Sequence, residues 1–185
     1  MDLGMFLTKI LVLATLAGNA LTVLLLVAHI CARPLFRRIT EFLSRNALLL
    51  GFLLSAGATL GSILYAEVTG YPACILCWGQ RIFMYPMMFL FALALWKKDR
   101  SIIPYALLLA VLGGAVALYQ WIKEMLALYT DIALACPAVP GVPSCDRIYV
   151  DEFGYITISM FALNAFILIA FVMYASLRMK KINHG

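Results

Sequence analysis

Residues 71–86 read YPACILCWGQRIFMYP and place two cysteines, Cys74 and Cys77, at the edge of an intensely apolar stretch. Pro72 just precedes the pair, so we expect a helix to begin near Cys74. Arg81 follows Cys77 along the same stretch, and positions three and four apart share one face of a helix. Both sulfurs and the guanidinium are therefore predicted to point the same way from one helix.

The whole chain is far more apolar than a soluble domain. Of its 185 residues, 65% are hydrophobic and 12% are charged, against about 45–50% and about 25% in ordinary soluble domains. A hydrocarbon core about 30 Å thick requires about 20 mostly apolar residues per helix. Five runs meet this requirement, at about residues 5–29, 47–66, 76–96, 102–122 and 155–177. The sequence thus predicts an all-α integral membrane protein.

The first run is expected to be a retained helix and not a signal peptide. It is much longer than the apolar core of about 7–15 residues found in signal peptides, and no basic leader precedes it. The residues before Cys31, Ala28 to Ile30, also do not resemble a lipoprotein cleavage site. The sequence therefore gives no reason to expect lipidation at Cys31.

Basic residues predict the orientation. If the chain crosses the membrane at every run, ten of the 14 basic residues fall on one side, which the positive-inside bias makes cytoplasmic. These are Arg33, Arg37, Arg38, Arg45, Lys97, Lys98, Arg100, Arg178, Lys180 and Lys181. The N-terminus is then outside and the C-terminus cytoplasmic. Because topology explains the net charge of +5, we predict no nucleic-acid partner.

Four of the five cysteines fall on the outer side in this topology. Cys74 and Cys77 lie at the mouth of the third run, Cys136 and Cys145 lie in a long outer loop at residues 123–154, and Cys31 faces the cytoplasm. The first part of that loop, residues 123–129, either extends the preceding helix or lies in the membrane interface. An oxidising compartment favours two disulfides among the outer four, and four cysteines allow three pairings. Proximity in the sequence favours the disulfide pairings Cys74–Cys77 and Cys136–Cys145. A zinc site is the alternative, but the spacing of the second pair does not resemble a zinc knuckle.

Each feature also has a purely structural interpretation. A Cys136–Cys145 disulfide would staple the Pro- and Gly-rich loop, whereas so small a ring at Cys74–Cys77 constrains the unfolded chain little. Two thiols at a helix start are instead typical of a reversible redox pair. Arg81 either extends its charged end to the lipid headgroups or belongs to a functional site. In such a site its positive charge would suit the carbonyl of a lipid-soluble quinone.

Neighbouring residues are assigned mainly structural roles. We interpret Trp78 mainly as an interfacial anchor, with a place in the wall of a quinone pocket beside Phe83 and Tyr85 as the alternative. Gly57 and Gly61 form a small-xxx-small step for close helix packing. Asn19, Asn46 and Asn164 are predicted to form hydrogen bonds between helices.

The combination of YPACILCWGQRIFMYP, the later pair in CPAVPGVPSC and the following FGYITISMFAL resembles the DsbB family of membrane disulfide-bond formation proteins, most closely its BdbC-type branch. The resemblance implies a four-helix bundle over residues 46–177. Residues 1–45 would add one N-terminal transmembrane helix and a basic cytoplasmic loop, and residues 178–185 a basic cytoplasmic tail. The location implied is the bacterial cytoplasmic (inner) membrane.

The resemblance also implies an activity and residue roles. The protein would reoxidise a DsbA-like thioredoxin-fold oxidase outside the cytoplasm and pass the electrons to ubiquinone or menaquinone. Cys136 matches the loop cysteine attacked by the partner, and Cys145 matches its companion. Cys74 and Cys77 match the membrane-proximal pair, with Cys77 next to the quinone, and Arg81 matches a quinone-interacting arginine.

Two other functions remain as alternatives. A vitamin K epoxide reductase-like quinone reductase uses similar chemistry, but its motif pair lies late in the bundle. A non-catalytic membrane scaffold with a stapled loop would tolerate loss of Cys74 or Cys77 without any change in cellular disulfide formation.

Overall fold

The computed structural model is entirely helical apart from its connecting segments. It describes residues 3–31, 33–130, 141, 143–145 and 148–184. The helices are α1 (Leu3–Cys31), α2 (Arg33–Arg45), α3 (Ala47–Thr69), α4 (Ile75–Lys97), α5 (Ile103–Tyr129) and α6 (Ile158–His184). All but α2 are long and apolar enough to span a membrane. The predicted fold class is confirmed.

Two boundaries differ from the prediction. The segment predicted as a basic loop contains α2, a short amphipathic helix with an Arg37–Glu41 ion pair at 2.9 Å. Helix α5 continues to Tyr129, so the outer loop predicted from residue 123 begins about one and a half to two turns later. Of the two alternatives for residues 123–129, the structure shows the extended helix, which buries the side chains of Lys123 and Glu124.

Local sequence explains where the helices begin and end. Gly70 adopts a left-handed conformation with φ of 66° and closes α3 through its N–H, which donates to the Ala66 carbonyl at 2.9 Å. Pro104 lies in the first turn of α5, where its missing N–H costs nothing. Between α4 and α5, Asp99 accepts hydrogen bonds from both the backbone N–H and the hydroxyl of Ser101, each at 2.8 Å.

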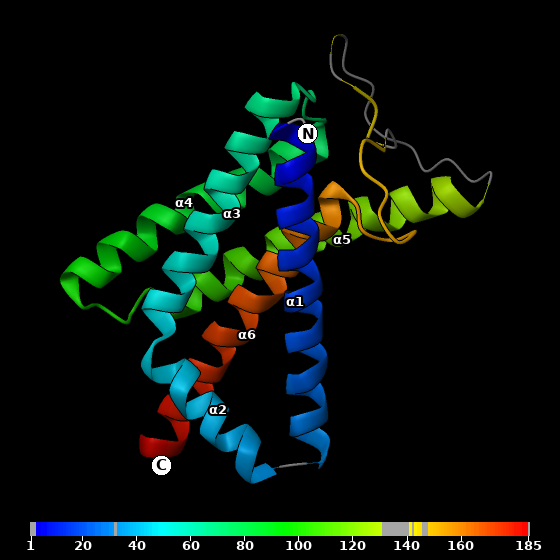
Figure 1. Ribbon diagram of the computed structural model, residues 1–185. Coiled ribbons are helices and arrows are strands. Elements are labelled where there is room, and N and C mark those ends of the chain that lie inside the picture. Colours follow the sequence, from blue (N-terminus) through cyan, green and yellow to red (C-terminus); the bar gives the residue numbers. More distant parts are fainter. Residues whose placement is uncertain (1–2, 32, 131–140, 142, 146–147, 185) are drawn as a thin grey trace.

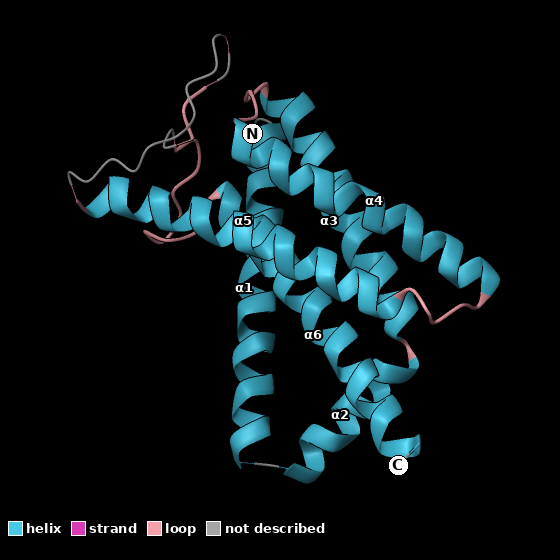
Figure 2. Ribbon diagram, turned by 180° about the vertical axis from the view of Figure 1, so that it is seen from behind, coloured by secondary structure: helices cyan, strands magenta, loops and turns pink. Residues whose placement is uncertain are grey.

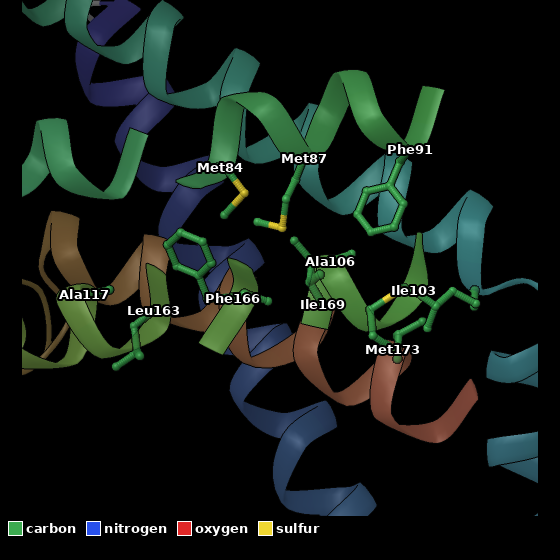
Figure 3. Packing of buried hydrophobic residues seen from close by; sticks show 13 residues of the cluster. Met84, Met87, Phe91, Ile103, Ala106, Ala117, Leu163, Phe166, Ile169 and Met173 are labelled. Atoms are coloured by element: carbon green, nitrogen blue, oxygen red, sulfur yellow. The ribbon is translucent and has the colours of Figure 1, made fainter. Parts of the chain in front are cut away.

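Helices α3 to α6 form the bundle and supply its core (Figures 1 and 2). The buried cluster includes Met84, Met87 and Phe91 of α4 packed near Phe166, Ile169 and Met173 of α6 (Figure 3). Gly113 of α5 lies so close to Phe166 that a Cβ atom there would overlap the ring. The core therefore depends on a close approach of α5 and α6.

Helix α1 packs on the bundle against α3 and α6. Asn164 of α6 donates to the Thr15 carbonyl at 3.0 Å and to Asn19 Oδ1 at 2.6 Å, which confirms two of the three asparagines as links between helices. The amide of Asn46 instead donates to the Phe42 carbonyl of the preceding helix turn at 3.0 Å. The predicted additional helix is thus present and is attached by polar contacts.

The basic segments come together at one end of the molecule. Arg100 donates to the Ser176 hydroxyl of α6 at 3.0 Å and to the Ser44 carbonyl of α2, so the α4–α5 connection joins α2 and the final turns of α6. In Figure 1 this end carries α2 and the C-terminus, whereas the start of α1 lies at the other end. The start of α1 is near the end of α3, where Gly4 faces Thr69.

Candidate functional site

Cys74 is the N-cap of α4. Its backbone is extended, with φ of −73° and ψ of 171°, and its sulfur accepts a hydrogen bond from the Cys77 N–H at 3.3 Å. Ser, Thr, Asp and Asn usually fill this position because the first N–H groups of a helix lack partners within it. The Cys-x-x-Cys spacing therefore positions one sulfur by capping the helix and the other one turn along it.

The two cysteines are free thiols in contact. Their Sγ atoms are 3.0 Å apart, and the Cys74 thiol donates to Cys77. A disulfide bond is about 2.05 Å long, so the structure holds the pair in the dithiol form. The hydrogen bond to Cys77, reinforced by burial, raises the pKa of Cys74 above its ordinary value. Cys74 therefore keeps its proton near neutral pH.

Cys77 receives a second hydrogen bond from the bundle interior. The Gln120 amide nitrogen of α5 lies 3.4 Å from the Cys77 sulfur, so an N–H and an S–H both point at this atom. Donors aimed at one atom stabilise negative charge that develops there. Of the two sulfurs, Cys77 is therefore the better placed to act as a nucleophile.

Behind Cys77 lies a buried polar cluster, defined by Gln80, Gln120, Glu124, Thr157 and Ser159. Gln80 donates to the Gln120 oxygen at 2.8 Å, and Gln120 donates to Glu124 at 3.0 Å. The other Glu124 oxygen accepts from Ser159, whose hydroxyl also pairs with Thr157 at 2.9 Å. This network orients the Gln120 amide toward the sulfur.

Sequence reasoning missed the buried polar cluster. It placed Glu124 on the outer side, in a segment that either extends the helix or lies in the interface, and gave no role to the two glutamines, although glutamines inside apolar runs are unusual. Glu124 lies four residues after Gln120, a spacing that puts both on one face of α5. The spacing of Gln120 and Glu124 could have indicated a polar pair on α5. The contacts with Gln80 and Ser159 could not be read from spacing, because they join residues on different helices.

Arg81 lies on the same side of α4 as the two thiols, as the spacing predicts. All three line one cavity of about 530 Å³, which is within the range of about 300–1,000 Å³ found for small-molecule sites. Arg81 Nε donates to the Ser62 hydroxyl of α3 at 3.2 Å, and its guanidinium carbon lies 5.1 Å from the centre of the Trp78 ring. The arginine is thus held between two helices.

The neighbouring aromatic residues divide into two groups. Phe83 and Tyr85 both pack against the hydrophobic core, and Tyr85 also lines the cavity. Trp78 is 54% exposed, which agrees with its interpretation as an interfacial anchor. Of the two glycines, Gly61 faces Leu11 of α1, whereas a Cβ atom at Gly57 would meet nothing within 4 Å. The predicted close packing therefore applies to Gly61 and not to Gly57.

The cavity also reaches the outer loop. Cys145 lines it, is only 2% exposed and is disulfide-bonded. Tyr149, four residues later, stacks on Tyr71 with ring centres 4.5 Å apart, and this contact holds the returning loop near the thiol pair. Cys136 lies outside the described residues, so its pairing stays a prediction. Cys31 ends α1 at the opposite end of that helix from Leu3.

The described residues offer no metal centre. Among them, no three His, Cys, Asp or Glu side chains are grouped in a way that could hold an ion. The arrangement present is instead a dithiol that opens into an apolar cavity, with a cation and a buried amide donor beside it. Such a site can exchange electrons by making and breaking a disulfide.

These features define a class, the membrane proteins whose helical bundle carries a candidate dithiol site. The profile of the family described as "Disulfide bond formation protein DsbB" matches residues 44–177. The chain therefore belongs to the DsbB family, a family of disulfide-forming oxidoreductases.

Similar proteins carry matching names. The chain is 40% identical over 113 residues to "Probable disulfide formation protein C 1" of Bacillus anthracis, covering 61% of this chain and 78% of the relative. It is 36% identical over 124 residues to "Probable disulfide formation protein C" of Halalkalibacterium halodurans, covering 67% and 88%. A "Probable disulfide formation protein" of Coxiella burnetii is 33% identical over 133 residues, covering 72% and 88%. No solved structure matches the chain significantly.

Proposed function

We propose that the protein reoxidises a DsbA-like thioredoxin-fold oxidase outside the cytoplasm and passes the electron pair to a membrane quinone. The observation that carries this proposal is the contact between the Cys74 and Cys77 thiols beside Arg81 in one apolar cavity. Cys145 lines the same cavity, so a loop disulfide and the helix pair lie within one site. Family membership supports the same chemistry.

The electrons move through two exchanges in this proposal. A partner thiolate attacks a Cys136–Cys145 disulfide, so the partner becomes oxidised and the loop pair becomes a dithiol. The loop dithiol then reduces a Cys74–Cys77 disulfide and regains its own. Each exchange breaks one S–S bond, forms another and conserves electrons and protons. The helix pair is left as the dithiol seen in the structure.

The final step returns the helix pair to its disulfide. A bound quinone would supply the acceptor for the two electrons and two protons released by the Cys74 and Cys77 thiols, giving the quinol. Arg81 and the apolar lining are the residues that would hold it, and the Arg81 charge suits its carbonyl oxygens. Gln120 stabilises negative charge on Cys77, and Cys74 releases its proton as the disulfide forms.

The basic end of the molecule supports the proposed orientation. Helix α2, the α4–α5 connection and the last turns of α6 meet there through Arg100. By the positive-inside bias this end is cytoplasmic. The thiols lie just after the end of α3, away from the basic end of the molecule. They would then face the compartment outside the cytoplasm, where a secreted oxidase is found. The bacterial relatives support a place in the cytoplasmic (inner) membrane.

A coupled assay tests the proposal. The purified full-length protein receives a quinone and a reduced thioredoxin-fold oxidase, and thiol loss and quinol formation are followed together. We expect equal amounts of the two products. If the wild-type protein forms no quinol while the partner stays reduced, the proposed function is wrong.

Single variants separate the two halves of the pathway. Arg81→Met is expected to lower quinol formation about 100-fold, the effect of removing one preorganised charge-stabilising donor, while leaving exchange with the partner intact. Cys136→Ser is expected to abolish partner oxidation. Cys31→Ser is the matched cysteine control and should retain wild-type turnover. If Arg81→Met and Cys136→Ser both had negligible effects, the proposed roles of these residues would be incorrect.

A further inference from the structure

Helix α1 lies before the residues matched by the family profile, yet it forms one wall of the cavity that contains the thiols. Its lining residues are Leu7, Ile10, Leu11, Ala14 and Thr15, which recur at the three- and four-residue spacing of a single helix face. This face runs for about 12 Å along the cavity, since a helix rises 1.5 Å per residue. The additional helix thus shapes the candidate site and does more than cover the bundle.

Specific contacts hold that face in place. Thr15 and Asn19 both accept hydrogen bonds from Asn164, and Gly18 leaves the space that the Asn164 amide occupies. Nearer its start, the Thr8 hydroxyl donates to the Tyr65 hydroxyl at 3.3 Å. A helix fixed at both positions presents a defined surface to the cavity.

The cavity differs in character from one side to the other. The two thiols, Arg81, Gln120 and Glu124 line the cavity from the start of α4 and from α5, whereas the α1 residues that line it are aliphatic apart from Thr15. The two sides adjoin on α3: Ser62 accepts the hydrogen bond from Arg81, and neighbouring Gly61 faces Leu11. These lining residues suit an amphiphile with a polar ring and a hydrocarbon tail.

We propose that the α1 face binds the isoprenoid tail of the quinone while the ring is bound beside Cys77 and Arg81. This inference rests on the proposed function and names the part of the substrate that α1 recognises. Contact with the tail contributes affinity through apolar burial, about 25 cal/mol per Å². The additional helix would therefore set the preference for tailed over tail-less quinones.

The test compares two quinones with the same ring, one carrying several isoprene units and one carrying none. Ala14→Trp places a bulky side chain on the cavity face, and Leu13→Trp places the same residue on the outward side, where Leu13 is 66% exposed. We expect Ala14→Trp to raise the KM for the tailed quinone about tenfold, equivalent to about 1.4 kcal/mol of binding. The KM for the tail-less quinone should change less than twofold, and Leu13→Trp should change neither.

A second variant covers the case in which Ala14→Trp does not fold. Leu11→Ala shortens the same wall without adding bulk, and it should raise only the KM for the tailed quinone, several-fold. Turnover of the tail-less quinone shows that each variant is folded and active.

The possible outcomes are distinguishable. Unchanged KM values for the tailed quinone in both α1 variants would overturn the inference. An equal rise for both quinones would also overturn it, because the ring site would then be the part affected. Failure of the wild-type protein to reduce either quinone would instead contradict the proposed function.

Discussion

At the residue scale, Gln120 makes the contacts that explain why the two sulfurs of the pair differ. Its amide nitrogen donates to both Cys77 and Glu124, and its oxygen accepts from Gln80 and, at 3.7 Å, from the Cys77 thiol. The nitrogen and the oxygen of this buried amide are thus both engaged in hydrogen bonds. A side chain so constrained keeps its donor aimed at one sulfur only.

Gln120→Leu is predicted to slow alkylation of Cys77 at pH 7 about tenfold, because the sulfur loses an N–H donor that stabilises its negative charge. Mass spectrometry of the iodoacetamide-treated protein measures modification of each cysteine. Cys77 should react before Cys74 in the wild-type protein, since Cys74 keeps its proton. Tyr119→Phe, at a neighbouring exposed position on α5, is the control and should behave like the wild type. Equal alkylation rates in Gln120→Leu and the wild type would contradict this prediction.

At the scale of the elements, Asn164 links α6 to the additional helix. Hydrogen bonds between helices in a membrane contribute about 0.6 kcal/mol on average and up to about 1.7 kcal/mol. Because Asn164 donates to both Thr15 and Asn19, its contribution should lie toward the upper end of that range.

Asn164→Leu is therefore predicted to lower the free energy of unfolding by about 1–2 kcal/mol. Titration of the purified protein from a mild detergent into a denaturing detergent measures this quantity. Ile167→Leu, three residues along the same helix at a 41% exposed position, is the control and should change it little. A stability equal to wild type in Asn164→Leu would show that the amide does not anchor α1.

The elements also show what sequence patterns can and cannot reveal. Apolar runs predicted the five long helices because a spanning helix must be apolar over its whole length. The charges in residues 33–45 suggested a loop, although a short amphipathic helix accommodates them on one face. For residues 123–129 the sequence left open a longer helix or an interfacial segment, and the structure has the longer helix, in which Glu124 is only 4% exposed and pairs with Gln120 and Ser159.

At the scale of the whole molecule, the candidate site was predictable only in part. The spacing of Cys74, Cys77 and Arg81 along one helix was sufficient to place them on one side, which the cavity confirms. The buried polar cluster and the α1 wall depend on contacts among four helices distant in the sequence. Such contacts follow from how the helices pack, and periodicity within one segment contains no information about them.

Packing of the whole bundle rests on the close approach of α5 and α6. Gly113→Ala is predicted to lower the free energy of unfolding by about 1–3 kcal/mol, the usual cost of overpacking a core, because the new methyl group would overlap the buried Phe166 ring. Gly114→Ala is the matched control: its Cβ would lie 3.4 Å from Phe166 Cβ, an ordinary contact. Thermal unfolding in detergent compares the two. The same melting temperature for both variants would contradict the prediction.

The five long helices have a practical consequence for labelling the protein in sealed vesicles. If each of the five candidate spans crosses the membrane, the start of α1 and the end of α6 lie on opposite membrane faces. An epitope attached before Leu3 and another attached after His184 would therefore respond differently to a protease added from one side. In this protein, the same helix that lines the cavity makes its orientation directly measurable from its two ends.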